Sequence, residues 1–201
     1  EKLTNMGRYR IRSGAGGPIF NLAYEQGIHD KSSDVDYKKF FAEISYNYNT
    51  RFLGIFRFKG RGGHVTGDIP LELTFNSKGS KRMPIYEPGV FFTMPVHRYF
   101  HNDFVQGFFQ YYKPFYINRS NLMFSVSTQM NVMYGSLNDR FQSFATHANK
   151  GYYEAGLLGG IMDPDVGQIT IGTFYNLGEY AQSDEINNFA FVVGFTTTID
   201  W

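Results

Sequence analysis

The segment 189–201 constrains the fold more than any other part of this chain. Its odd-numbered positions read Phe, Phe, Val, Phe, Thr, Ile and Trp, whereas its even-numbered positions read Ala, Val, Gly, Thr, Thr and Asp. Alternate residues of a β-strand point to opposite faces of the sheet. One face of this segment is therefore almost wholly apolar, the other is small or polar, and the segment ends on an aromatic residue. Transmembrane β-barrels require strands of this kind, apolar outside and polar inside, with aromatic residues at the membrane boundary.

The composition agrees with a β-barrel and argues against a helical membrane protein. Aromatic residues make up 18% of the 201 residues, with 15 Tyr, 21 Phe and one Trp, which suits the aromatic girdles of a barrel. No apolar run approaches the ~20 residues of a membrane-spanning helix. The formal net charge is +1, so nucleic acid is not an expected partner. Because the chain has no cysteine, a disulfide framework and a thiolate metal site are excluded.

The two-residue alternation recurs along the chain between turn signals. Most of the alternating segments reach the ~9–11 residues that a tilted membrane strand needs. About ten such segments is an even number, as is typical of bacterial single-chain barrels. We therefore predict an all-β fold, an antiparallel transmembrane β-barrel of about ten strands over residues 18–201, after a lead-in segment at 1–17. The predicted strands are 18–28, 38–48, 51–60, 67–76, 88–97, 104–116, 120–135, 151–163, 167–178 and 188–201.

A few residues and one loop depart from this scheme. Met123, Met133 and Leu158 are apolar residues at positions that the alternation assigns to the inward face, where Glu154 also lies. If the chain ends at the periplasmic edge, the periplasmic turns are 49–50, 77–87, 117–119 and 164–166, and the other loops are outside. Short turns inside and long loops outside are expected of such barrels, and the turn 77–87 is too long for this arrangement.

Charged residues on the inward face predict a cluster inside the barrel. A hairpin turn centred on Thr50 would place Glu43 across from Arg57, and the register of the next hairpin would place Arg57 across from Glu72. Glu25 is expected nearby. Because buried ions need partners and small barrels fill their interiors with side chains, we interpret the cluster as a structural plug rather than an ion or proton path.

Histidines offer the second set of candidate site residues. All five fall in or beside the predicted outer loops, and His97, His101 and His147 are the candidates for an outer-rim site. Histidine is both the commonest metal ligand and a frequent acid or base in catalysis. However, no spacing matches a metal motif, and polar residues collect in outer loops in any case. The sequence therefore assigns no catalytic residue, no metal site and no cofactor.

Four short runs resemble a known family of membrane proteins. They are Pro18–Gly27 (PIFNLAYEQG), Gly67–Leu73 (GDIPLEL), Arg98–Phe104 (RYFHNDF) and Gly151–Gly156 (GYYEAG). In this order they resemble the C-terminal barrel of a Bacteroidetes outer-membrane family whose members carry an N-terminal carboxypeptidase-regulatory-like domain. That barrel is itself distantly similar to the outer-membrane assembly (insertase) superfamily. The resemblance spans most of 18–201 and implies a bacterial outer-membrane location and a role in envelope assembly.

The resemblance has a departure that bears on function. The insertase superfamily places an Arg-Gly-aromatic motif on a loop that folds into the lumen, whereas the nearest run here, 61–63, reads Arg-Gly-Gly. The resemblance also implies either the C-terminal part of a longer barrel or a shortened relative. A barrel that lacks strands would have an open edge, which hydrocarbon does not tolerate unless something covers it.

These observations lead to three functional hypotheses. The first is a non-enzymatic outer-membrane protein, a structural or envelope-assembly component of a membrane complex, whose partners are outer-membrane lipid and other outer-membrane proteins. The alternatives are a small channel or ligand receptor, and an outer-rim hydrolase. A soluble β-sandwich is the structural alternative, and it would bury the aromatic stripes between two sheets.

Overall fold

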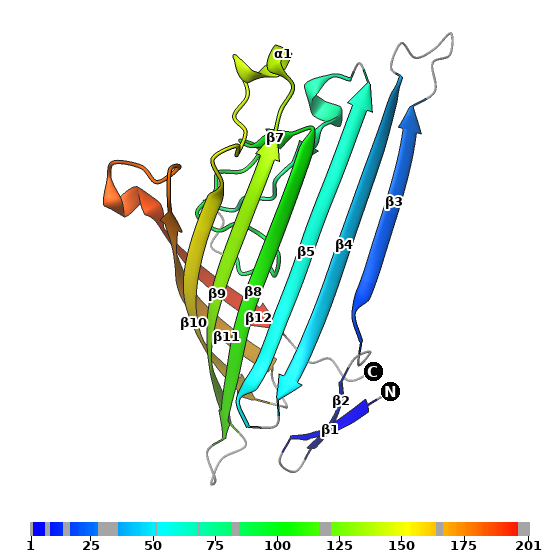
Figure 1. Cartoon of the computed structure of the whole chain (residues 1–201). Helices are drawn as coiled ribbons and strands as arrows, with labels where there is room; N and C mark the ends of the chain where they lie inside the picture. The colour runs from blue at the N-terminus through cyan, green and yellow to red at the C-terminus, as the bar shows by residue number, and fades with distance from the viewer. Residues whose placement is uncertain are drawn as a thin grey trace.

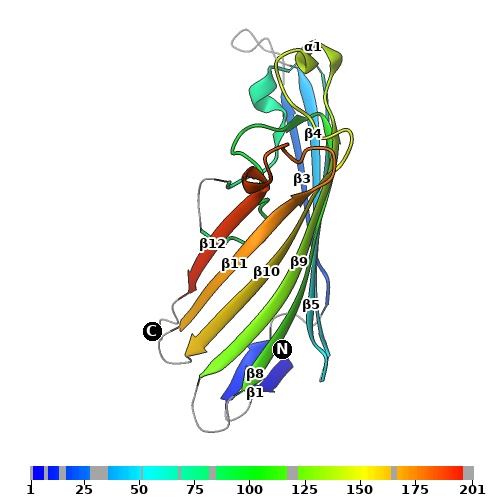
Figure 2. The same cartoon turned by 90° about the vertical axis from the view of Figure 1, so that its left-hand side faces the viewer.

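A computed structural model describes residues 2–6, 9–13, 17–27, 36–50, 52–67, 69–81, 85–116, 122–163 and 167–196. Its main feature is one antiparallel sheet of eight strands, in the order β12-β11-β10-β9-β8-β5-β4-β3. The sheet curls strongly and so has a convex and a concave face (Figures 1 and 2). Its strands are β3 (Ile19–Gly27), β4 (Tyr37–Thr50), β5 (Gly54–Gly67), β8 (Asp103–Tyr116), β9 (Met123–Ser136), β10 (Tyr152–Asp163), β11 (Gly167–Leu177) and β12 (Phe189–Thr196).

The remaining elements are short. β1 (Lys2–Met6) and β2 (Tyr9–Ser13) pair with each other in a separate hairpin, within the predicted lead-in segment. η1 (Leu71–Leu73), β6 (Phe75–Asn76) and β7 (Phe100–His101) lie between β5 and β8, and α1 (Asp139–Gln142) and η2 (Glu185–Asn188) lie in later loops. In the part of the chain that the structure describes, no helix is long and apolar enough to cross a membrane.

The all-β, antiparallel prediction is confirmed, but the sheet has eight strands and is not closed. Among the described residues, no strand pairs with the outer edge of β3 or β12, and only an isolated bridge from Ile85 reaches Val193 at the β12 edge. The predicted strands 67–76 and 88–97 are wrong. Apart from Gly67, which ends β5, their described residues lie in 69–81 and 85–102, which are here together called the insert. Pro70, Pro88 and Pro95 interrupt these stretches and lack the N–H group that a strand ladder needs.

The convex face of the sheet is apolar and exposed from one edge to the other. The prediction for 189–201 is confirmed over the described part of β12, where Phe189, Phe191, Val193 and Phe195 are exposed and Ala190 and Val192 are buried. Every other strand shows the same outward row. Its exposed members include Phe20, Leu22, Tyr24, Phe40, Phe56, Val105, Phe109, Phe124, Val126, Met130, Tyr134, Leu157, Ile161, Ile169 and Ile171.

The core lies on the concave face, where the insert packs against β8–β12 (Figure 2). Phe91 contacts the rings of Phe108 and Tyr152, at centroid distances of 5.0 and 5.6 Å. Phe92 contacts Phe174 at 4.3 Å. The inward apolar residues that broke the alternation belong here, because Met133 and Leu158 are buried in the two clusters that the insert forms with the sheet.

The insert also explains the loop that did not fit. The described parts of 77–87, which are 77–81 and 85–87, do not form a turn between two strands, because they lie within the insert, which leaves the sheet after β5 and returns to it at β8. The long connections between β5 and β8, β9 and β10, and β11 and β12 therefore lie at one end of the sheet. The β4–β5 connection at the other end is only 51–53, so the expected asymmetry of loop lengths is kept.

Candidate functional site

The carboxylate of Glu154 fixes the insert to the sheet. This side chain on β10 is fully buried and accepts hydrogen bonds from the backbone N–H groups of Phe92 and Thr93, at 3.0 and 2.9 Å. The Thr93 hydroxyl donates a third at 2.7 Å, and the Asn131 side-chain amide a fourth at 2.6 Å. A buried carboxylate needs such donors to offset the loss of water. Glu154 is therefore the polar anchor at the centre of the insert.

Arg61 makes a second connection between the sheet and the insert. Its Nε donates to the Glu43 carboxylate at 2.6 Å and its Nη1 donates to the carbonyl of Gly89 in the insert at 2.9 Å. The guanidinium also lies over the ring of Phe108, 5.5 Å from the centroid. Lys59 Nζ lies 3.3 Å from the same Glu43 oxygen. Two cations from β5 thus share one carboxylate from β4 on the concave face.

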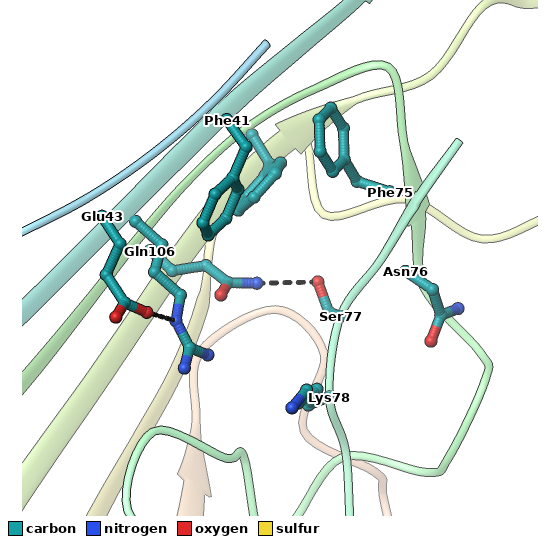
Figure 3. Close-up of a pocket in the computed structure, with 9 residues that line it drawn as sticks. Phe41, Glu43, Phe75, Asn76, Ser77, Lys78 and Gln106 are labelled. Carbon is teal, nitrogen blue, oxygen red and sulfur yellow. Dashed lines mark hydrogen bonds and ion pairs between the residues drawn. The ribbon is translucent and has the colours of Figure 1, made fainter. Parts of the chain in front are cut away.

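A pocket of about 310 Å³ opens between these strands and the start of the insert. Figure 3 shows Phe41 and Phe75 at one end of it and Lys78 at the other, with Glu43 on the sheet side. The rings of Phe75 and Phe104 are 4.8 Å apart and those of Phe41 and Phe104 are 6.4 Å apart. The pocket therefore joins an aromatic wall to a charged end. Its remaining lining residues are Arg61, Asn76, Ser77 and Gln106.

The predicted charge cluster does not form as expected. Glu43 lies opposite Arg61 rather than Arg57, because the β4–β5 turn occupies 51–53 and is not centred on Thr50. Moving the turn by two residues moves every cross-strand partner by four. Arg57 lies instead opposite Asn47 and Gln110, and its Nη1 donates to the Gln110 side chain at 3.3 Å.

The other two members of the predicted cluster lie elsewhere. Glu72 is an exposed residue of η1, beyond the end of β5 that is remote from Arg57. Its expected hairpin register fails because 67–76 is not a strand of the sheet. Glu25 on β3 accepts a hydrogen bond from the Tyr37 hydroxyl. Of the four predicted residues, the structure thus brings only Glu43 into the charged pair network of the concave face.

The three candidate histidines have different environments. His101 in β7 is fully buried, and its Nε2 lies 3.1 Å from the Ser77 hydroxyl. Its Nδ1 has no partner among the described residues and lies against Gly135. His147 is half-buried and close enough to His101 to affect its charge. His97 is exposed in a turn, with a positive φ of 51°, which histidine adopts more readily than most residues.

Ser77 and His101 have the spacing of a nucleophile and its base, but their surroundings suit a buried polar network. Ser77 also receives a hydrogen bond from Gln106 Nε2 at 2.9 Å and donates to Met133 Sδ at 2.8 Å. Its exposed fraction is 2%. Because the Ser77 hydroxyl donates to Met133, its oxygen accepts from Nε2 of His101, which therefore carries the proton, while the buried Nδ1 is left without a donor among the described residues. Among the described residues, no group of three His, Asp or Glu side chains could hold a metal ion.

The buried imidazole predicts a loss of stability in acid. Burial, with a smaller contribution from His147, lowers the pKa of His101 from 6.5 to about 4. Between these pH values the unfolded chain binds more protons than the folded chain. The contribution of the neutral ring is therefore complete above pH 6.5 and is lost as the pH falls towards 4, by roughly 3 kcal/mol at most.

Urea unfolding between pH 4 and 7.5 measures this slope. The His101→Gln variant, which cannot titrate at this position, is expected to have a flatter stability profile between pH 4 and 6.5. Equal slopes in the variant and the original chain would show that His101 is not the group responsible.

The sequence missed the residues that carry most of this site. Glu154 was predicted to face inward, but its partners Phe92 and Thr93 lie about 60 residues away in an irregular segment. The available signal was the inward apolar residues Met133 and Leu158, which mark where the insert packs. Comparisons with protein-family models, with curated proteins and with solved structures find no match to this chain.

Proposed function

We propose that this sheet is part of a transmembrane β-barrel in the outer membrane of a Gram-negative bacterium. In this proposal the protein acts without catalysis of its own, as a structural or envelope-assembly component of a membrane complex. The observation that carries the proposal is the convex face, on which large apolar side chains from all eight strands are exposed. Large apolar patches of this kind mark contact with a membrane or with another protein.

The dimensions and edges of the sheet support the same proposal. β4, β5, β8 and β9 have 14 residues each, more than the ~9–11 that a tilted membrane strand needs. An eight-stranded barrel has an interior just wide enough for its own side chains, whereas here the insert also packs against the concave face, over β8–β12. The sheet is therefore completed by further strands rather than by closure of β3 on β12. Because β3 and β12 are antiparallel, an even number of added strands closes the barrel.

Adjacent residues on β3 provide a direct test, since the chain has no cysteine of its own. Leu22 is outward and 72% exposed, and Ala23 is exposed on the inward face. In membrane vesicles, a water-soluble maleimide is expected to label Ala23→Cys and to leave Leu22→Cys unlabelled. Both variants should react in denaturant, which serves as the control. Equal labelling of the two variants in vesicles would overturn the membrane proposal.

A ligand receptor is the second candidate function. The observation that favours it is the pocket between β4, β5, β8 and the insert, with its aromatic wall and charged end. Its volume of about 310 Å³ lies at the lower end of the range for small-ligand sites. In a completed barrel, the pocket would face the lumen on the part of the concave face that the insert leaves uncovered.

A further inference from the structure

We infer that this pocket binds a small organic anion, a phosphate or carboxylate that carries an aromatic or other apolar group. The inference rests on the receptor function proposed for the pocket and adds the chemical class of its ligand. It depends on two features of the pocket wall, a surplus of cationic groups and a cluster of phenylalanine rings. Both features combine the sheet with the insert, since β5 supplies Arg61, β4 and β8 supply Phe41 and Phe104, and the insert supplies Lys78 and Phe75.

The concave side of β5 carries a row of positive charge. Arg57, Lys59 and Arg61 alternate along this strand and therefore point to the same face. Glu43 is the carboxylate that lies within ion-pair distance of Lys59 and Arg61, so it neutralises one of two cations. Arg57 is held by a neutral amide, that of Gln110. The strand thus keeps a net positive charge, and Arg61 is its member that lines the pocket.

Lys78 adds a cation from the opposite wall. Its side chain is exposed and forms no ion pair with any residue that the structure describes. Figure 3 shows Lys78 on the insert side of the pocket, across from Glu43 on the sheet. The fixed guanidinium of Arg61 also lines the pocket. Charged hydrogen bonds from lysine and arginine are the usual means of binding phosphate and carboxylate groups.

The phenylalanine rings define the other half of the ligand. Phe41, Phe75 and Phe104 form one cluster, with centroid distances of 4.8 to 6.5 Å. Lys39 fixes it from the sheet, since its ammonium lies 4.7 Å above the Phe75 ring and donates to the Leu73 carbonyl at 3.0 Å. A rigid apolar wall favours a flat or apolar group on the ligand. A bare inorganic anion would leave this wall unused.

Calorimetric titration of the full chain with phenyl phosphate, inorganic phosphate and phenol tests the inference. Phenyl phosphate is expected to bind more tightly than either of the other two. Lys78→Gln should weaken phenyl phosphate binding about tenfold, because one charged hydrogen bond is lost, and Lys78→Arg should keep it. Phe75→Leu should weaken the binding of phenyl phosphate and leave the affinity for inorganic phosphate unchanged.

Lys150→Gln is the matched control, because Lys150 is an exposed lysine that pairs with Glu179 in the loops, at 3.2 Å. It should leave binding unchanged. Absence of saturable phenyl phosphate binding, or equal effects of Lys78→Gln and Lys150→Gln, would overturn the inference. The maleimide experiment is independent of ligand binding, so failure of the ligand class can be told apart from failure of the membrane proposal.

Discussion

Glu154→Ala is expected to lower the free energy of unfolding by about 3–5 kcal/mol. The substitution leaves the N–H groups of Phe92 and Thr93 and the side chains of Thr93 and Asn131 without their shared acceptor. All four donors are buried between the insert and the sheet. An unsatisfied buried donor costs about 1–3 kcal/mol. Urea titration of the protein in detergent micelles measures the loss.

The same substitution should release the insert from the concave face. Limited trypsin digestion detects this, because Lys78 and Lys81 lie within the insert and cleavage there requires local opening. Glu154→Gln keeps the volume and one acceptor oxygen, so its loss should be smaller than that of Glu154→Ala. Glu179→Ala removes a carboxylate from an exposed pair and is expected to cost no more than about 1 kcal/mol. Equal losses for Glu154→Ala and Glu179→Ala would show that Glu154 does not anchor the insert.

The strands were predictable because their two faces have different surroundings. In β9, the even-numbered residues Phe124, Val126 and Met130 are exposed, while Ser125, Ser127, Gln129 and Asn131 are buried. This exposed apolar row beside a buried polar row was predicted from the alternation alone. The alternation is a local property of the chain, so it can be recognised without knowing which strand pairs with which. It therefore identified all eight strands of the sheet, although β5 continues to Gly67 where the predicted strand ended at 60.

The insert was not predictable, because its residues do not form two faces with different surroundings. Phe91, Phe92 and Met94 are all fully buried, because a segment enclosed within a curled sheet meets neighbours on several sides. Buried residues then follow no period of two, and the stretch 88–97 imitates an apolar strand. The pairing of Glu43 with Arg61 depended on where one turn begins, which composition around Thr50 did not determine. The pocket is lined by the insert and by the Glu43–Arg61 pair, so the sequence could not locate it.

Met130→Arg is expected to separate a membrane protein from a soluble sheet. Met130 lies near the middle of β9 on the convex face and is 46% exposed. Arginine on the lipid face near the bilayer midplane costs about 2–4 kcal/mol and near the interfaces about 0–1 kcal/mol. Phe124→Arg is the matched control, since Phe124 is the second residue of the same strand and is also outward. Urea titration in lipid vesicles should therefore show a large loss for Met130→Arg and little change for Phe124→Arg.

A soluble sheet would respond differently to the same pair of variants. Substitution of an exposed residue in water usually changes stability by less than about 0.5 kcal/mol, so neither arginine would matter. A β-sandwich that buries the convex face against a second sheet would be destabilised by both, since each arginine would enter an apolar core. Of these three environments, only a bilayer makes the free-energy cost of the arginine depend on its position along the strand. The difference between Met130→Arg and Phe124→Arg thus tests the lipid-facing role of the convex face independently of the insert and of the pocket.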